Sequence, residues 1–134
     1  MKVLFSDYSA AYYSSLTGRH LPQRQTGKFV QIRHGQTEYL IFSPKEFTRY
    51  HADIVKLFCD ERGIDGFFNP TVKSFDIYDP DWMVIGGGKF ELDREDKYLR
   101  LYDNSMAYGK FDAKGLRKKI LSIKTFSGFK VQIE

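Results

Sequence analysis

Residues 29–42 read FVQIRHGQTEYLIF, two strand-like runs joined by a short polar segment. Both runs, 29–33 and 39–42, are rich in β-branched and aromatic residues, and the connecting segment contains a glycine. This pattern predicts a β-hairpin. A sheet also fits the composition, because 16% of the residues are aromatic and flat rings pack well on a pleated surface.

The residues after this hairpin predict a helix. Ser43 is a favourable N-cap, Pro44 suits the first helical position, and Glu46 completes a capping box. Apolar residues then recur at spacings of three and four, which predicts one buried stripe formed by Phe47, Tyr50, Ile54, Val55 and Phe58. His51 lies on or beside that stripe. Gly63 is expected to end the helix.

Several further strands are predicted beyond this helix. Residues 64–82 form a loop-rich segment in which 74–78 alternates like an edge strand. Residues 82–85 are a continuous apolar run of strand length that ends at three glycines. Residues 90–92 and 98–102 alternate around a charged turn and predict a second hairpin.

The last quarter of the chain predicts a second helix and a final strand. Asp112 is a good N-cap, and Phe111 and Leu116 are placed to form a hydrophobic staple around it. Residues 129–133 alternate as a strand, whereas residues 1–27 show no readable pattern. The prediction is one α/β domain over residues 1–134, a sandwich whose mixed central sheet of five to seven strands is flanked by two α-helices.

Composition narrows the functional classes. No run of 18 apolar residues is present, which argues against a membrane span, and the N-terminus lacks the apolar region of a secretion signal. Cys59 is the only cysteine, so an internal disulfide and a multi-cysteine zinc site are excluded. His20 and His34 have no partners at metal-ligand spacing. We therefore expect a cytoplasmic monomer without metal or other cofactor.

The charges are unevenly distributed along the chain. Residues 1–43 carry 5 basic and 2 acidic groups, residues 44–109 carry 9 and 13, and residues 110–134 carry 7 and 2, which gives +3, −4 and +5. Basic ends could attract nucleic acid or an acidic protein. The C-terminal cations, however, fit the solvated face of the predicted second helix, so we expect no nucleic-acid partner.

Three short segments carry residues suited to phosphate chemistry: YHAD at 50–53, GGGK at 86–89 and DNSMAYG at 103–109. A neutral imidazole at His51 could attack phosphorus or activate water near pH 7, although a buried helix histidine with a backbone partner is the simpler reading. The Ser105 hydroxyl and the backbone N–H groups of 105–107 could hold phosphate oxygens, or the loop could be only a tight turn. The glycines could equally mark a bulge, and they do not form a Walker A loop.

Together these segments resemble the phosphohistidine phosphatases of the Janus/Ocnus family, over about residues 28–134. YHAD matches the catalytic segment of that family, and SMAYG matches its phosphate-binding loop. In the family, three glycines in this context precede a basic residue, usually arginine, whose place Lys89 takes here. Lys28 matches a basic residue near the active site by position, and Arg33 at the end of the same predicted strand is the alternative.

The resemblance implies a function and a set of site residues. The function is metal-independent hydrolysis of the P–N bond of phosphohistidine, or of phospholysine, in histidine-phosphorylated proteins. His51 is the implied catalytic residue, as nucleophile or general base. The implied phosphate-binding residues are Lys28, Tyr50, Ala52, Gly88, Lys89, Ser105, Met106 and Ala107.

Two departures from the family pattern concern the substrate. Ser43 stands where some members carry an arginine, and extra residues are present at about 66–82. Two other functional classes remain open from the sequence. One is a non-catalytic module that binds phosphorylated proteins through the same anion pocket, and the other is a basic nucleic-acid-binding domain that uses exposed aromatic residues for stacking.

Overall fold

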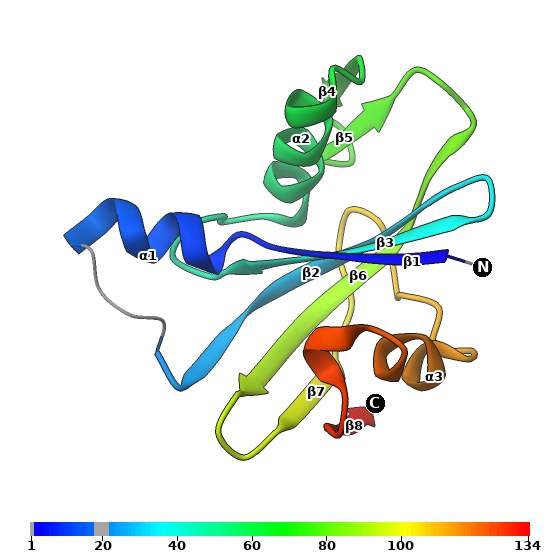
Figure 1. Ribbon diagram of the computed structural model, residues 1–134. Helices are drawn as coiled ribbons and strands as arrows, with labels where there is room; N and C mark the ends of the chain where they lie inside the picture. The colour runs from blue at the N-terminus through cyan, green and yellow to red at the C-terminus, as the bar shows by residue number, and fades with distance from the viewer. Residues whose placement is uncertain (1, 18–21) are drawn as a thin grey trace.

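A curved six-stranded sheet forms the centre of the fold (Figure 1). The structure, a computed structural model, describes residues 2–17 and 22–134, with the backbone alone for 14–17. In spatial order the strands are β1 (Lys2–Asp7), β3 (Thr37–Pro44), β2 (Arg24–His34), β6 (Trp82–Asp93), β7 (Tyr98–Tyr102) and β8 (Lys130–Ile133). The two outer pairs, β1 with β3 and β7 with β8, are parallel, and the inner pairs are antiparallel. The predicted α/β fold with a mixed sheet is confirmed.

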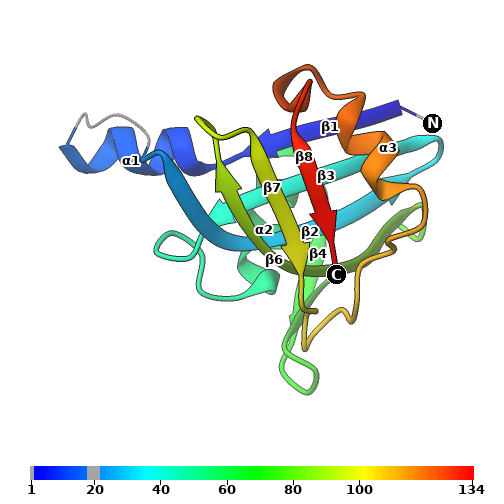
Figure 2. The same ribbon diagram turned by 90° about the horizontal axis from the view of Figure 1, so that it is seen from below.

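Helices cover both faces of this sheet. α2 (His51–Arg62) lies on one face, and α3 (Leu116–Leu121) with the short 3₁₀ helix η1 (Lys124–Phe126) lies on the other (Figure 2). α1 (Ser9–Thr17) follows β1 at one end of the sheet. A separate two-stranded sheet, β4 (Gly66–Asn69) with β5 (Ser74–Ile77), packs beside α2.

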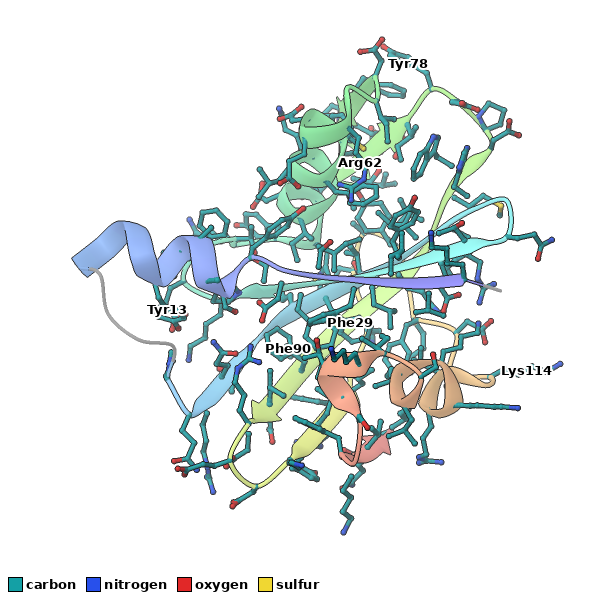
Figure 3. The ribbon with its side chains drawn as sticks, viewed as in Figure 1. Tyr13, Phe29, Arg62, Tyr78, Phe90 and Lys114 are labelled. Atoms are coloured by element: carbon teal, nitrogen blue, oxygen red, sulfur yellow. The ribbon has the colours of Figure 1, made fainter. Side chains whose placement is uncertain are left out.

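Strand alternation divides the apolar residues of the sheet between two cores. In β2, Phe29 points toward α3 and Val30 points toward α2. Phe29 and Phe90 lie between the sheet and the α3–η1 segment, whereas Lys114 extends into solvent (Figure 3). The α3 core is the larger and is built mainly from Phe29, Leu40, Phe42, Phe90, Leu92, Leu99, Leu101, Phe111, Leu116, Ile120 and Phe126. Cys59 is buried in the α2 core.

The first predicted helix begins later than expected. Ser43 and Pro44 do not cap it, because they continue β3 and pair with Lys28 and Gly27 of β2. Pairing in the sheet thus overrides a strong local helix signal. The N-cap of α2 is Tyr50. Phe47 and Tyr50, which were predicted in the buried stripe, are 41% and 57% exposed.

The remaining helix predictions for this segment are correct. Ile54, Val55 and Phe58 are buried as the spacing predicts, and so is His51. Gly63 ends the helix in the left-handed conformation with φ of 66°, and its N–H donates to a carbonyl of the last turn.

The second predicted helix also begins later, at Leu116 instead of Asp112. The Asp112 carboxylate accepts a hydrogen bond from Arg33 at 2.9 Å and another from the Lys114 N–H at 3.0 Å, so it stabilises a turn before the helix. Gly115 precedes the helix with φ of 68°, a conformation that does not continue a right-handed helix. Phe111 and Leu116 are both buried in the α3 core.

Three strand predictions need correction. The apolar run at 82–85 does not end at the glycines, because β6 continues through them to Asp93 and includes the strand predicted at 90–92. Strand β4 lies in the segment predicted as loop, although its partner β5 was expected. Residues 2–17, which showed no pattern, form β1 and α1. His20 lies outside the described residues.

None of the helices in the described ranges, 2–17 and 22–134, is both long and apolar enough to cross a membrane.

Candidate active site

The three glycines of β6 are the point at which the predicted site segments meet. All three are buried, and each is closely approached by another part of the chain. A Cβ atom at Gly87 would lie 2.7 Å from the Cδ2 atom of His51 and 2.7 Å from the Phe29 carbonyl oxygen. A Cβ at Gly88 would lie 2.5 Å from the carbonyl oxygen of Tyr102. Only glycine therefore fits at these positions without displacing backbone.

The bulge that the glycines could have marked is also present. Gln31 of β2 pairs with Gly86, and the next residue, Ile32, pairs with Val84, so Ile85 is the extra residue on β6. Strand β7 pairs with β6 only from Lys89 to Asp93. At Gly87, which β7 does not reach, Lys110 forms an isolated parallel bridge instead. The glycines thus serve both the bulge and the close approach of other segments.

His51 is the first residue of α2, and its ring lies against the glycines. The Nε2 atom is 2.9 Å from the carbonyl oxygen of Gly88. A carbonyl oxygen can only accept a hydrogen bond, so Nε2 carries the hydrogen in this contact. In the neutral ring the lone pair is then on Nδ1, the nitrogen on the other side of the ring.

Burial lowers the pKa of the His51 imidazole below its ordinary value. The positive charges of Lys28 and Lys89 lower this pKa further, whereas the hydrogen bond to Gly88 and the carboxylate of Asp103 oppose the shift. The side chain is 8% exposed. The ring is therefore neutral at physiological pH, and its Nδ1 atom is unprotonated.

The start of α2 is fixed by a reciprocal pair of hydrogen bonds. The N–H of Tyr50 donates to the Asp53 carboxylate at 3.0 Å, and the N–H of Asp53 donates to the Tyr50 carbonyl oxygen at 3.1 Å. The N–H groups of His51 and Ala52 lie in the first turn, where a helix has no internal acceptors. The Tyr50 side chain is 57% exposed, with the Arg49 guanidinium 5.5 Å from its ring centre. An anion at this end of α2 would meet amides and a favourable dipole.

The predicted phosphate loop is a closed turn attached to β6. The N–H of Ser105 donates to the Gly109 carbonyl oxygen at 3.1 Å, and the N–H of Gly109 donates back to Ser105 at 2.7 Å. The Gly109 carbonyl oxygen also accepts from the N–H of Gly87 at 3.1 Å. The loop is thereby anchored to Gly87, the glycine that also contacts the His51 ring.

The loop differs in one respect from the nest that the sequence predicted. The Ser105 amide is not available to a ligand, because Gly109 already accepts its hydrogen. Ser105 is also 2% exposed, and its Oγ accepts the Tyr108 N–H at 3.1 Å. The amides of Met106 and Ala107 have no acceptor within the described part of the chain, and the Met106 side chain is fully exposed. These two amides are the free donors of the loop.

Two lysines lie beside the histidine on the α2 face of the sheet. Lys28 of β2 and Lys89 of β6 are register partners on neighbouring strands. Strand alternation places both on the same face as Gly87, and both act on the pKa of His51. Arg33, the alternative to Lys28, lies on the other face, where it pairs with Glu38 at 2.6 Å and with Asp112 at 2.9 Å. The geometry thus favours Lys28.

Asp103 is a charged neighbour whose role the sequence did not indicate. Its Oδ2 atom is 3.0 Å from the Nζ of Lys89. The Lys89 ammonium lowers the pKa of the Asp103 carboxyl, and a hydrogen bond from the Asn104 N–H lowers it too. A backbone φ of 65° makes Asp103 a left-handed residue. An aspartate just after a strand is a common turn signal, so sequence alone offered no reason to connect it with Lys89.

Tyr108 connects the loop to the two-stranded sheet. Its hydroxyl accepts the N–H of Phe75 at 2.7 Å and donates to the carbonyl oxygen of the same residue at 3.0 Å. The hydroxyl therefore occupies the place of a neighbouring strand at the edge of β5. Burial raises the pKa of the Tyr108 phenol, so the hydroxyl stays protonated. The segment at about 66–82 thus supports the loop directly.

Two hollows of the surface lie away from this arrangement. One, of about 600 Å³, is formed by β2, β6 and β7 near Asp93, and another, of about 570 Å³, lies beside α3 and Ile133. Neither includes His51 or the loop. Among residues 2–17 and 22–134, no cluster of three or more His, Cys, Asp or Glu side chains could hold a metal ion.

The protein is thus a small α/β protein in which a neutral histidine at the start of a helix contacts the glycines of a central strand. A loop with two free amides is hydrogen-bonded to one of the same glycines. The model of the Janus/Ocnus family (Ocnus) matches residues 26–130. Because that match covers most of the chain, the protein belongs to the Janus/Ocnus family. No curated protein matches the sequence.

Proposed function

We propose that this protein is a phosphohistidine phosphatase that hydrolyses the P–N bond of phosphorylated histidine in proteins. One observation carries the proposal: the Nε2–H of His51 is held by the Gly88 carbonyl, so that a neutral ring keeps its lone pair on Nδ1. The lowered pKa of His51 keeps that lone pair available at physiological pH. The loop anchored to Gly87 supplies amides on the same strand.

The lone pair can act in two ways. In direct attack, Nδ1 forms a bond to phosphorus while the P–N bond of the substrate breaks, and water later releases phosphate from His51. In general-base catalysis, Nδ1 accepts a proton from a water molecule whose oxygen attacks phosphorus. In both, the substrate imidazole leaves with the electron pair of the broken bond and takes up a proton.

The neighbouring groups would bind the phosphoryl oxygens. The free amides of Met106 and Ala107 and the first-turn amides of α2 are neutral donors that cost little to orient, since the backbone holds them in place. Lys28 and Lys89 supply positive charge on the same face of the sheet. Ser105 would act mainly by shaping the loop, and Gly88 by holding His51.

Phosphate release from a histidine-phosphorylated protein tests the proposal. The assay contains EDTA, because we expect turnover without added metal, and it uses the wild type, His51→Ala and His34→Gln. His34 is the matched control, since its ring stacks on Trp82 with centroids 4.1 Å apart, away from the glycines. We expect His51→Ala to lose at least about 100-fold in rate, in the range of general-base and nucleophile deletions, and His34→Gln to retain it.

The possible outcomes separate the functional classes. Binding of the phosphorylated protein without phosphate release would indicate a binding module, and salt-dependent binding of oligonucleotides without release would indicate a nucleic-acid-binding domain. A quench in base followed by a search for phosphate on His51 distinguishes the two catalytic routes. Full activity of His51→Ala would disprove the assignment.

A further inference from the structure

The two lysines beside His51 differ in their counter-ions. Lys89 forms an ion pair with Asp103, with Nζ and Oδ2 3.0 Å apart. Lys28, its register partner on β2, has no ion-pair partner among the described residues. One of the two cations on this face is therefore free to meet an anion, and the other is already engaged.

The backbone conformation of Asp103 and the contacts of its carboxylate place the side chain beside Lys89. Its φ of 65° is a conformation that glycine adopts with least strain, and only Asp and Asn among other residues tolerate it readily. The second carboxylate oxygen accepts the Asn104 N–H at 2.9 Å, and the Asp103 carbonyl oxygen accepts from Lys110 Nζ at 3.0 Å. These contacts fix the side chain toward Lys89.

Folding stability does not account for this carboxylate. The Lys89 and Asp103 side chains are 46% and 40% exposed, and ion pairs at such exposure contribute little to stability. Asp103 stands two residues before Ser105, at the start of the loop. Its charge acts on the His51 ring in opposition to the two lysines. The carboxylate is thus placed where an anion would bind.

We propose that Asp103 is a positioning residue that holds Lys89 while the anion site is empty and releases it to a phosphoryl group that binds. This inference rests on the proposed phosphatase function. Because Lys89 exchanges one anionic oxygen for another, its net contribution to phosphate binding is reduced. Asp103 also repels the bound anion. The protein therefore binds the product, inorganic phosphate, weakly and releases it readily.

The affinity for inorganic phosphate tests this inference without requiring turnover. The full chain is titrated with phosphate in EDTA, and the amide signals of Met106 and Ala107 are followed by NMR. Asp103→Asn keeps the side-chain carbonyl that accepts the Asn104 N–H and suits the left-handed backbone, but it lacks the charge. We expect its Kd for phosphate to be about three- to tenfold lower than that of the wild type, from the loss of one nearby negative charge.

Two further variants isolate the cause. Glu91→Gln removes a carboxylate from the same face of β6, one that pairs with Arg100 at 2.9 Å, and should leave the Kd unchanged. In a Lys89→Met background, Asp103→Asn should improve binding by less than half as much, because only the repulsion remains to be removed. Asp103→Gly, which fits the backbone without strain, replaces Asp103→Asn if the latter does not fold.

Each result has a definite meaning. Unchanged or weaker phosphate binding by Asp103→Asn, with normal binding by the wild type, overturns the inference and leaves the proposed function intact. Equal tightening by Glu91→Gln overturns it as well, because the effect is then one of net charge. Absence of phosphate binding in the wild type overturns both the anion site and the inference. Phosphate binding without turnover contradicts only the phosphatase activity.

Discussion

The Nε2 atom of His51 donates a hydrogen bond to the carbonyl oxygen of Gly88, and this contact determines which ring nitrogen is free. Gly88 can approach the ring only because its neighbour Gly87 has no side chain. The glycines of β6 thus bring the imidazole and the strand into direct contact. The Gly88 carbonyl fixes the tautomer of the imidazole, and the missing side chain of Gly87 leaves room for the ring.

The lowered pKa of His51 predicts the pH dependence of turnover. The neutral ring is the active form, so the rate should rise with pH through the lowered pKa of His51 and reach half of its plateau value below about pH 6.5, where an unperturbed histidine is half protonated. NMR titration of the His51 ring and the pH–rate profile should give the same value. A pKa at or above that of a free imidazole would contradict the prediction.

The lowered pKa of His51 also makes the free energy of unfolding depend on pH. Between the lowered pKa of the folded state and about 6.5, the unfolded chain binds more protons at this residue than the folded chain does. The contribution of His51 to the free energy of unfolding is therefore present above that window and is lost as the pH falls through it. His51→Gln should lack this part of the pH dependence, as thermal unfolding between pH 5 and 8 would reveal.

Ser105→Ala should both destabilise the protein and weaken catalysis. The hydroxyl is buried and accepts the Tyr108 N–H, so its removal leaves that amide without a partner, at a cost of about 1–3 kcal/mol. Ser122→Ala is the control, because its exposed hydroxyl bonds only to the nearby Lys119 carbonyl. Chemical denaturation and steady-state kinetics measure the two effects. Unchanged stability would show that the loop does not depend on this contact.

Tyr108→Phe should loosen the attachment of the β4–β5 sheet to the loop. The variant keeps the ring but leaves the N–H and carbonyl of Phe75 unpaired, which should cost about 1–3 kcal/mol. Hydrogen exchange at the Phe75 amide should become faster. Tyr78→Phe, at a residue 65% exposed just after β5, should change neither quantity. Equal effects in both variants would refute a specific role for the Tyr108 hydroxyl.

The sequence predicted well those elements whose partners are close along the chain. The hairpin of residues 29–42 and the one ending at Tyr102 are both present, because a short connection fixes the pairing. It failed at both helix starts. Ser43 and Asp112 are good caps in isolation, but Ser43 pairs with Lys28 and Asp112 with Arg33. The Lys28–Ser43 pair extends the predicted hairpin by one further pair of residues, and Arg33 lies far from Asp112 in the sequence; local propensity accounts for neither.

The candidate site shows the same division. Short motifs singled out His51, Lys89 and the loop, and strand alternation brings them to the same glycines. No motif could reveal that the Gly109 carbonyl accepts the hydrogen bond of the Ser105 amide, or that Asp103 forms an ion pair with Lys89. Both contacts depend on the path of the folded backbone. The residues that tune the proposed chemistry are thus less visible in the sequence than those that perform it.

The bond between the Gly87 amide and the Gly109 carbonyl also has a consequence for biosynthesis. A ribosome delivers the N-terminal part of a chain first, and domains tend to fold as units once enough of them has emerged. The loop cannot close on β6 until residue 109 has left the exit tunnel. Nascent chains that have released the helix of His51 but not yet residue 109 therefore lack the closed loop beside the histidine.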